Sequence, residues 1–122
     1  MKYLKTFEQN KDKFDYSNQN LNELPKLPYS LQRLCCYNNN LTELPELPDS
    51  LQRLYCYNNN LTSLPELPDS LKYLNCYHNN LPFENLDGYK KWYKENESLI
   101  KERGISYAYK FYNKVNKYNI FD

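Results

Sequence analysis

The residues of this 122-residue chain with the most chemical potential are its four cysteines. Cys36, Cys56 and Cys76 follow one another at intervals of 20 residues, and Cys35 directly precedes the first of them. This spacing does not match the paired CxxC ligands of zinc sites. Because free cysteine is often buried as a small apolar side chain, we predict that the three spaced cysteines are reduced, buried thiols. A disulfide between neighbours and a metal site are the alternatives to this interpretation.

Catalysis would need groups that this sequence hardly provides. A nucleophilic Cys35 would require a nearby base, yet the one histidine, His78, lies two of these intervals further along the chain. The only glycines are Gly88 and Gly104, which excludes a glycine-rich phosphate-binding loop. We therefore predict that Cys35 is an incidental exposed thiol, and that the chain is not an enzyme and has no catalytic residues, cofactor or metal.

Composition and charge limit the functional classes to which this chain can belong. The formal net charge of +1 argues against a protein that holds nucleic acid mainly by neutralising phosphates, although arginine and tyrosine side chains keep nucleic-acid binding as a minor alternative. No stretch approaches the roughly 20 consecutive apolar residues of a membrane span. The start, MKYLKTFEQNK, lacks the apolar core of a signal peptide. Together with an exposed Cys35, these features predict a protein of a reducing, intracellular compartment that does not enter membranes.

Three consecutive segments of 20 residues carry the same residues in the same places. They begin at Leu21, Leu41 and Leu61, and the second reads LTELPELPDSLQRLYCYNNN. Leucine and cysteine two residues apart, such as Leu54 and Cys56, would point to the same side of a short strand. The prolines of the LPxLP stretch remove backbone donors and favour an extended return segment. A single coil of this kind exposes its leucines, and only stacked coils bury them.

The pattern LxxLxCxxNxL, which begins at Leu31, Leu51 and Leu71, resembles the signature of the leucine-rich repeat family. The repeat length and the LPxLP stretch are similar to a short subclass known from secreted bacterial effectors and from proteins of large viruses of amoebae. The resemblance implies a right-handed solenoid with parallel β-strands on its concave face and an extended, polyproline-like convex side. It also implies a role in protein–protein interaction, often with host proteins.

The same resemblance implies an alternative function. Effectors with similar repeats can carry a C-terminal ubiquitin-ligase domain with a catalytic cysteine. No cysteine follows Cys76 in this sequence, so this alternative is a recognition fragment or adaptor that lacks the catalytic domain.

Three regions are expected along the chain. Residues 1–13 form an N-terminal cap, in which Leu4 and Phe7 cover the first coil. Residues 14–84 form a solenoid of one degenerate and three regular coils, and residues 85–122 form a helical C-terminal cap. A solenoid end needs such a lid, because its last coil would otherwise expose its core to water. A separate functional helix pair is the alternative role of the C-terminal region.

The C-terminal region is predicted to contain two helices. The first begins at an Asp87 N-cap and ends at Gly104, and its apolar stripe comprises Leu86, Tyr89, Trp92 or Tyr93, Leu99 and Ile100. The second has apolar residues at spacings of three and four, which are Ile105, Ala108, Phe111, Val115 and Tyr118. Alternation of aromatic residues between Tyr107 and Phe111 leaves a strand as the alternative.

One asparagine in each coil lies where the chain leaves the strand, at Asn39, Asn59 and Asn79. A buried asparagine at such a turn can satisfy backbone groups of its own coil and of the next one. We therefore predict a structural ladder of these asparagines. The asparagines beside them and His78 suit a polar turn.

The outward strand positions are the candidate binding residues. They form three columns across the coils, which are Lys13, Arg33, Arg53 and Tyr73; Asp15, Cys35, Tyr55 and Asn75; and Ser17, Tyr37, Tyr57 and Tyr77. Tyrosine and arginine are enriched at binding hot spots, whereas the convex turns are acidic. We therefore predict that an unidentified protein partner binds the concave face, and that the arginines hold its carboxylates or phosphates. The predicted binding residues are Arg33, Arg53, Tyr55, Tyr57, Tyr73, Asn75 and Tyr77. For the third column, a tyrosine ladder that only stabilises the fold is the alternative.

Overall fold

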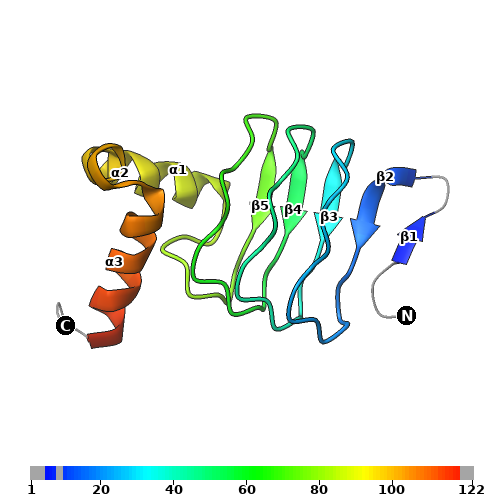
Figure 1. Cartoon of the computed structure of the whole chain (residues 1–122), viewed down its shortest axis with the longest axis horizontal. Helices are drawn as coiled ribbons and strands as arrows, with labels where there is room; N and C mark the ends of the chain where they lie inside the picture. Colours follow the sequence, from blue (N-terminus) through cyan, green and yellow to red (C-terminus); the bar gives the residue numbers. More distant parts are fainter. Residues whose placement is uncertain (1–4, 8–9, 119–122) are drawn as a thin grey trace.

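A computed structural model describes residues 5–7 and 10–118, with side chains from residue 13 to residue 116 (Figure 1). The predicted contacts of Leu4 and of the Phe7 side chain lie outside this described part. Five strands form one sheet in chain order, and three helices follow them. The strands are β1 (Lys5–Phe7), β2 (Asn10–Asp15), β3 (Arg33–Cys35), β4 (Arg53–Tyr55) and β5 (Tyr73–Asn75). The helices are α1 (Leu86–Glu95), α2 (Glu97–Arg103) and α3 (Ile105–Tyr118).

The sheet follows the 20-residue repeat without a slip. Strands β2 to β5 pair in parallel, whereas β1 adds to β2 in the antiparallel direction. Leu34 pairs with Leu54, and Leu54 with Leu74, so equivalent residues of successive coils are direct neighbours. Phe14 pairs with Leu34 in the same way, which confirms the register predicted for the degenerate first coil.

The core is the stack of inward leucines and cysteines. Cys36, Cys56 and Cys76 are free thiols and are almost completely buried, as the spacing of the repeat predicts. Burial raises the pKa of the Cys76 thiol to about 12 and also raises the pKa of the other two. These three thiols therefore serve as small apolar side chains in the core.

The asparagines that follow strands β3 to β5 form the predicted ladder; Asn39 and Asn59 are buried and Asn79 is partly buried. The Asn59 side-chain oxygen accepts a hydrogen bond from the backbone N–H of Leu41, at 3.0 Å. Its Nδ2 donates to the carbonyl oxygens of Cys36 and Cys56, at 3.0 and 3.1 Å, so one side chain joins two successive coils. Asn39 and Asn79 make the equivalent bonds.

A second, exposed ladder flanks the first. Asn38 and Asn58 have positive φ angles of 57° and 54°, a conformation that asparagine tolerates better than most residues. Asn58 Nδ2 donates to Asn38 Oδ1 at 2.7 Å, and Asn38 donates to Asn18 in turn. His78 occupies the same place in the next coil with φ 55°, as expected for a turn residue.

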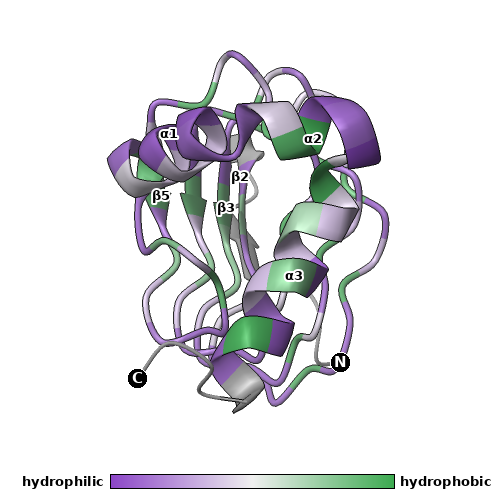
Figure 2. Cartoon of the chain, turned by 90° about the vertical axis from the view of Figure 1, so that its left-hand side faces the viewer, coloured by the Kyte–Doolittle hydropathy of each residue, from purple (hydrophilic) through white to green (hydrophobic). Residues whose placement is uncertain are grey.

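The three helices lie across the C-terminal end of the solenoid (Figures 1 and 2). Trp92 of α1 stacks on Tyr109 of α3, with ring centroids 4.8 Å apart, and both rings pack near Phe83, which follows the last coil. These residues belong to one apolar core with the leucines and cysteines of the coils. Asn113 of α3 also donates to the backbone oxygen of Thr62, at 3.1 Å.

The first predicted helix is in fact two helices, and its N-cap is wrong. Asn85 is the N-cap of α1, because its Oδ1 accepts from the N–H of Gly88 at 2.8 Å; Asp87 lies in the first turn. The helix breaks at Asn96, whose φ of −109° and ψ of 16° depart from helical values. Asn96 Nδ2 donates to the oxygen of Trp92 at 2.9 Å, beside the regular backbone bond from the Asn96 N–H to the same oxygen at 3.0 Å. Of the two aromatic candidates, Trp92 is the buried one, 8% exposed, whereas Tyr93 is 37% exposed.

The second predicted helix is confirmed as α3, and the strand alternative is wrong. Its apolar face differs from the predicted stripe at Phe111 and Tyr109, and the side chain of Tyr118 lies outside the described residues. Ala108 and Tyr109 are buried, Ile105 and Val115 are partly buried, and Phe111 is 48% exposed. Consequently α3 presents an aromatic residue to solvent beside the lysines at 110 and 114.

Candidate functional site: the concave sheet and a cleft beside the helices

The predicted binding columns are aligned by the sheet itself. Arg33 pairs with Arg53, and Arg53 with Tyr73, so the first column runs straight across three coils. The second column passes from Cys35 through Tyr55 to Asn75 in the same register. The parallel sheet thus places Arg33, Arg53, Tyr55, Tyr73 and Asn75 side by side on one surface.

Contacts between the columns join several of these side chains into one cluster. The Arg33 guanidinium carbon lies 5.2 Å from the centroid of the Tyr55 ring, within the range of a cation–π contact. The ring of Tyr55 lies 5.1 Å from that of Tyr73, with a tilt of 38°. Tyr73 is 45% exposed and Arg53 is also exposed, so this cluster reaches solvent.

The third column is divided between two kinds of tyrosine. Tyr37 and Tyr57 stack face to face, with centroids 4.5 Å apart and an interplanar angle of 4°. Burial and the neighbouring Tyr37 raise the pKa of Tyr57. Tyr77 is 40% exposed and enters no such stack among the described side chains. The geometry of a self-stabilising ladder therefore holds for Tyr37 and Tyr57 but does not extend to Tyr77.

Cys35 lies on the outward side of β3, as predicted, but it is half-buried rather than fully exposed. Burial raises the pKa of its thiol, and the adjacent Arg33 offsets part of this effect by stabilising the thiolate. Asp15, from the neighbouring coil, acts in the opposite direction and raises the pKa. Cys35 thus lacks the depressed pKa of an activated nucleophile.

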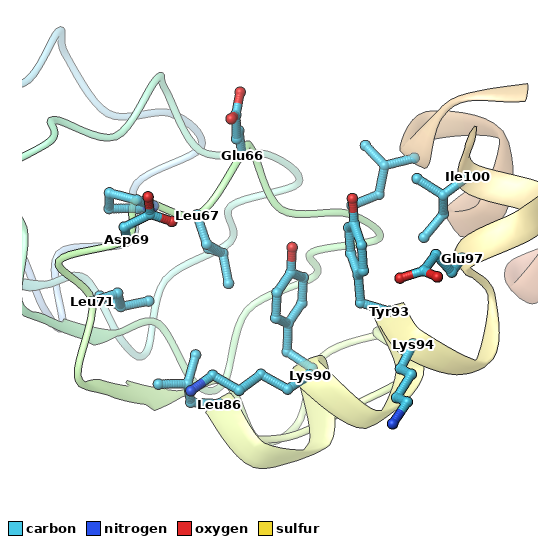
Figure 3. Close-up of a pocket in the computed structure, with 13 residues that line it drawn as sticks. Glu66, Leu67, Asp69, Leu71, Leu86, Lys90, Tyr93, Lys94, Glu97 and Ile100 are labelled. Atoms are coloured by element: carbon cyan, nitrogen blue, oxygen red, sulfur yellow. The ribbon is translucent and has the colours of Figure 1, made fainter. Parts of the chain in front are cut away.

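The sequence did not reveal a cleft of about 790 Å³ between the last return segment and the helices (Figure 3). Leu67 and Pro68 form one wall, and Tyr89 and Tyr93 of α1 form the other. Ile100 of α2 lines the same cleft. The cleft depends on the break between α1 and α2, so repeat spacing alone carries no signal for it.

Two further classes of site can be assessed in the structure. Among the described residues, no group of three or more histidine, cysteine, aspartate or glutamate side chains is arranged to hold a metal ion. No helix in the described ranges is both long and apolar enough to cross a membrane.

Comparison with known proteins identifies the fold family. The family model described as "Leucine Rich repeats (2 copies)" matches residues 29–68 and 49–91. A solved structure of YopM from Yersinia enterocolitica WA-314 is similar, with a TM-score of 0.53 and 44% identity over 57% of this chain and 16% of that chain. A solved structure of a Shigella effector LRR domain has 34% identity and a TM-score of 0.48, over 58% of this chain and 42% of that chain. This chain therefore spans less than half the length of either structure.

No curated protein sequence gives a significant match. The family match covers strands β3 to β5, the start of α1 and most of the candidate binding columns. Its extent agrees with the parallel sheet and with the row of buried leucines. The chain belongs to the leucine-rich repeat family.

Proposed function

We propose that this chain is a non-enzymatic interaction module that binds a protein partner through its concave sheet. The observation that carries this proposal is the cluster of Arg33, Tyr55 and Tyr73, with Arg53 exposed beside it. The backbone of this surface is fixed by parallel pairing, so little conformational entropy is lost when a partner binds. Arginine and tyrosine together provide charge-assisted hydrogen bonds and apolar contact area.

Each predicted residue has a distinct role in this proposal. Arg33 and Arg53 hold carboxylates or phosphates of the partner, and Tyr55, Tyr73 and Tyr77 supply apolar contact. Asn75 ends β5, between Tyr73 and Tyr77 in the sequence, and offers a hydrogen-bonding amide. Tyr57 contributes the edge of its stack with Tyr37, so its role is more rigid and more structural than that of Tyr77.

The similarity of the repeats to those of bacterial effectors indicates which organism supplies the partner. We infer that the partner is a host protein and that the chain acts in the host cytoplasm. The free thiol of Cys35, which reaches the surface, is compatible with such a reducing compartment. The 44% identity to YopM supports this inference at the level of the repeats.

The experiment is a quantitative capture of host proteins from lysate with the wild-type chain and with Arg53→Ala/Tyr55→Ala. Truncation of a hot-spot arginine or tyrosine costs about 2 kcal/mol or more in binding, which is roughly a thirtyfold loss of affinity. We therefore expect the double variant to lose the specific partner. Its melting temperature should fall only modestly, because Arg53 is exposed and the partly buried Tyr55 lies outside the leucine core.

The matched control is Glu23→Ala/Glu43→Ala, which removes two exposed charges from the convex side. This variant should capture the partner as the wild type does. If the convex pair abolishes capture and the concave pair does not, the binding surface lies on the convex side and the proposal is wrong.

A further inference from the structure

The cleft beside the helices exposes the end of an apolar row. Leu27, Leu47 and Leu67 occupy the same place in three successive coils, and the first two are buried. Leu67 is only partly buried, because the chain supplies no fourth leucine of this row; α1 and α2 stand back from it and leave the cleft. Figure 3 shows Leu67 and Leu71 on one side of the opening and Ile100 on the other. The cleft therefore offers an apolar surface against which an apolar side chain of a ligand can pack.

A strip of carboxylates adjoins this apolar seat. Glu66 and Asp69 line the cleft, and Glu46 and Asp49 occupy the equivalent places one coil earlier. A smaller groove of about 200 Å³ is lined by all four residues together with Leu67, so the strip and the cleft are continuous. All four side chains are exposed. Like charges on adjacent coils repel one another, and a cationic ligand would relieve this repulsion.

The opposite wall is aromatic and carries the only cations of the cleft. The pKa of the half-buried Tyr89 is raised by burial and, to a smaller extent, by Tyr93 and Glu66, which places these groups near its hydroxyl. Lys90 and Lys94 also line the wall. Figure 3 shows the Lys94 side chain directed away from the opening, so it does not neutralise Glu66 across the cleft.

We propose that this cleft and the adjoining carboxylate strip, Glu46, Asp49, Glu66 and Asp69, form a second binding surface for a basic amphipathic segment of a partner protein. Apolar side chains of that segment enter the cleft beside Leu67 and Ile100. Its lysines or arginines lie over the strip. The charge of the strip selects a basic segment, and the cleft distinguishes an amphipathic one from a merely charged one. This surface is separate from the concave face, so the proposal does not depend on the proposed function above.

The experiment measures fluorescence anisotropy of a labelled synthetic peptide composed of leucine and lysine in an amphipathic order, with the full chain at physiological ionic strength. We expect saturable binding by the wild type and at least tenfold weaker binding by Glu66→Gln/Asp69→Asn. Glu23→Gln/Glu43→Gln is the matched charge control and should bind as the wild type does. Arg53→Ala/Tyr55→Ala should also bind normally, which separates this surface from the concave one.

Two further measurements locate the peptide and test its specificity. Amide chemical shifts should change at Leu67, Tyr89 and Ile100 when the peptide binds. A peptide with glutamate in place of lysine, and a scrambled peptide without an apolar face, should both bind at least tenfold more weakly. Equal binding of the scrambled peptide would show simple charge attraction and overturn the proposal.

Other outcomes also overturn it. Absence of saturable binding by the wild type excludes this class of ligand. Equal losses in the Glu23/Glu43 and Glu66/Asp69 variants show that the peptide responds to total charge and not to the cleft. A dimer in sedimentation that the Glu66→Gln/Asp69→Asn variant dissociates would assign the cleft to a second copy of the chain, for which the basic α3 is the available segment.

Discussion

Cysteine illustrates how one residue type takes two environments in the same coil. Cys36 points into the core, where burial raises the pKa of its thiol, while Cys35 points outward and is half-buried beside Arg33. The pKa of Cys35 is also raised, so its thiolate fraction at neutral pH is lower than that of free cysteine. Its reactivity should therefore come from access alone.

We predict that iodoacetamide modifies only Cys35 in the native protein. Because its pKa is raised, the reaction at pH 7 should be slower than that of free cysteine. The rate should rise about tenfold per pH unit until the pH approaches the raised pKa of this thiol. Mass spectrometry of time points checks this. In denaturant all four thiols should react, and Cys35→Ser should abolish the native reaction. Rapid native modification of Cys36, Cys56 or Cys76 would contradict the core assignment.

At this scale, the sequence predicts what the repeat period determines. The asparagine ladder and the cysteine column depend only on a 20-residue period and on the alternation of strand side chains, so both are confirmed. The pKa of the partly buried Cys35 depends on Arg33 of the same strand and on Asp15 of the adjacent strand, through side-chain conformations that no spacing encodes. The stack of Tyr37 on Tyr57, and the absence of Tyr77 from it, also depends on ring rotations that no spacing encodes.

At the scale of elements, the helices also show features that residue spacing does not predict. Apolar spacing predicts helical structure after residue 85 and the position of α3, but it does not reveal the break at Asn96. That break lies in the backbone conformation of one residue, Asn96, with φ −109° and ψ 16°, which leaves the apolar pattern unchanged. Since the break directs α2 away from α1, the cleft lined by Tyr93 and Ile100 could not be predicted either.

The helices also provide a test of which face of α1 packs on the coils. We predict that Trp92→Ala destabilises the protein by about 3 to 5 kcal/mol, because it removes a large buried ring that stacks on Tyr109. Tyr93→Ala, one residue further along the same helix, should cost clearly less, about 1 kcal/mol, because Tyr93 is 37% exposed and lies in the wall of the cleft rather than in the core. Urea denaturation followed by circular dichroism measures both. Similar losses in the two variants would mean that α1 is rotated about its axis.

At the scale of the whole molecule, the two ends of the solenoid are covered in different ways. At the N-terminal end, β1 pairs with β2 in the antiparallel direction and covers the first edge of the sheet. At the C-terminal end, an isolated bridge joins Asn75 to Asn85, and the helices then cover the core that the last coil leaves open. Between these ends each coil contacts mainly its neighbours, so stability in such a stack is a sum of intrinsic and interface contributions.

From this arrangement we predict that deletion of residues 86–122 destabilises the whole stack. Phe83, Cys76 and Leu74 are buried in the intact chain, and all three lie at the end that the helices cover. The remaining coils bury too little apolar surface to offset their chain entropy with a wide margin. A loss of several kcal/mol corresponds to a fall in melting temperature of more than about 15 °C, since each kcal/mol shifts the melting temperature of a domain of this size by about 4 to 8 °C.

Thermal unfolding followed by circular dichroism tests this prediction. The control is Tyr107→Ser/Phe111→Ser, on the exposed face of α3, which should melt like the wild type. If the truncated chain kept its strand signal and its melting temperature, the helices would not act as a cap, and their retention would have to be explained by the cleft they form with the last coil.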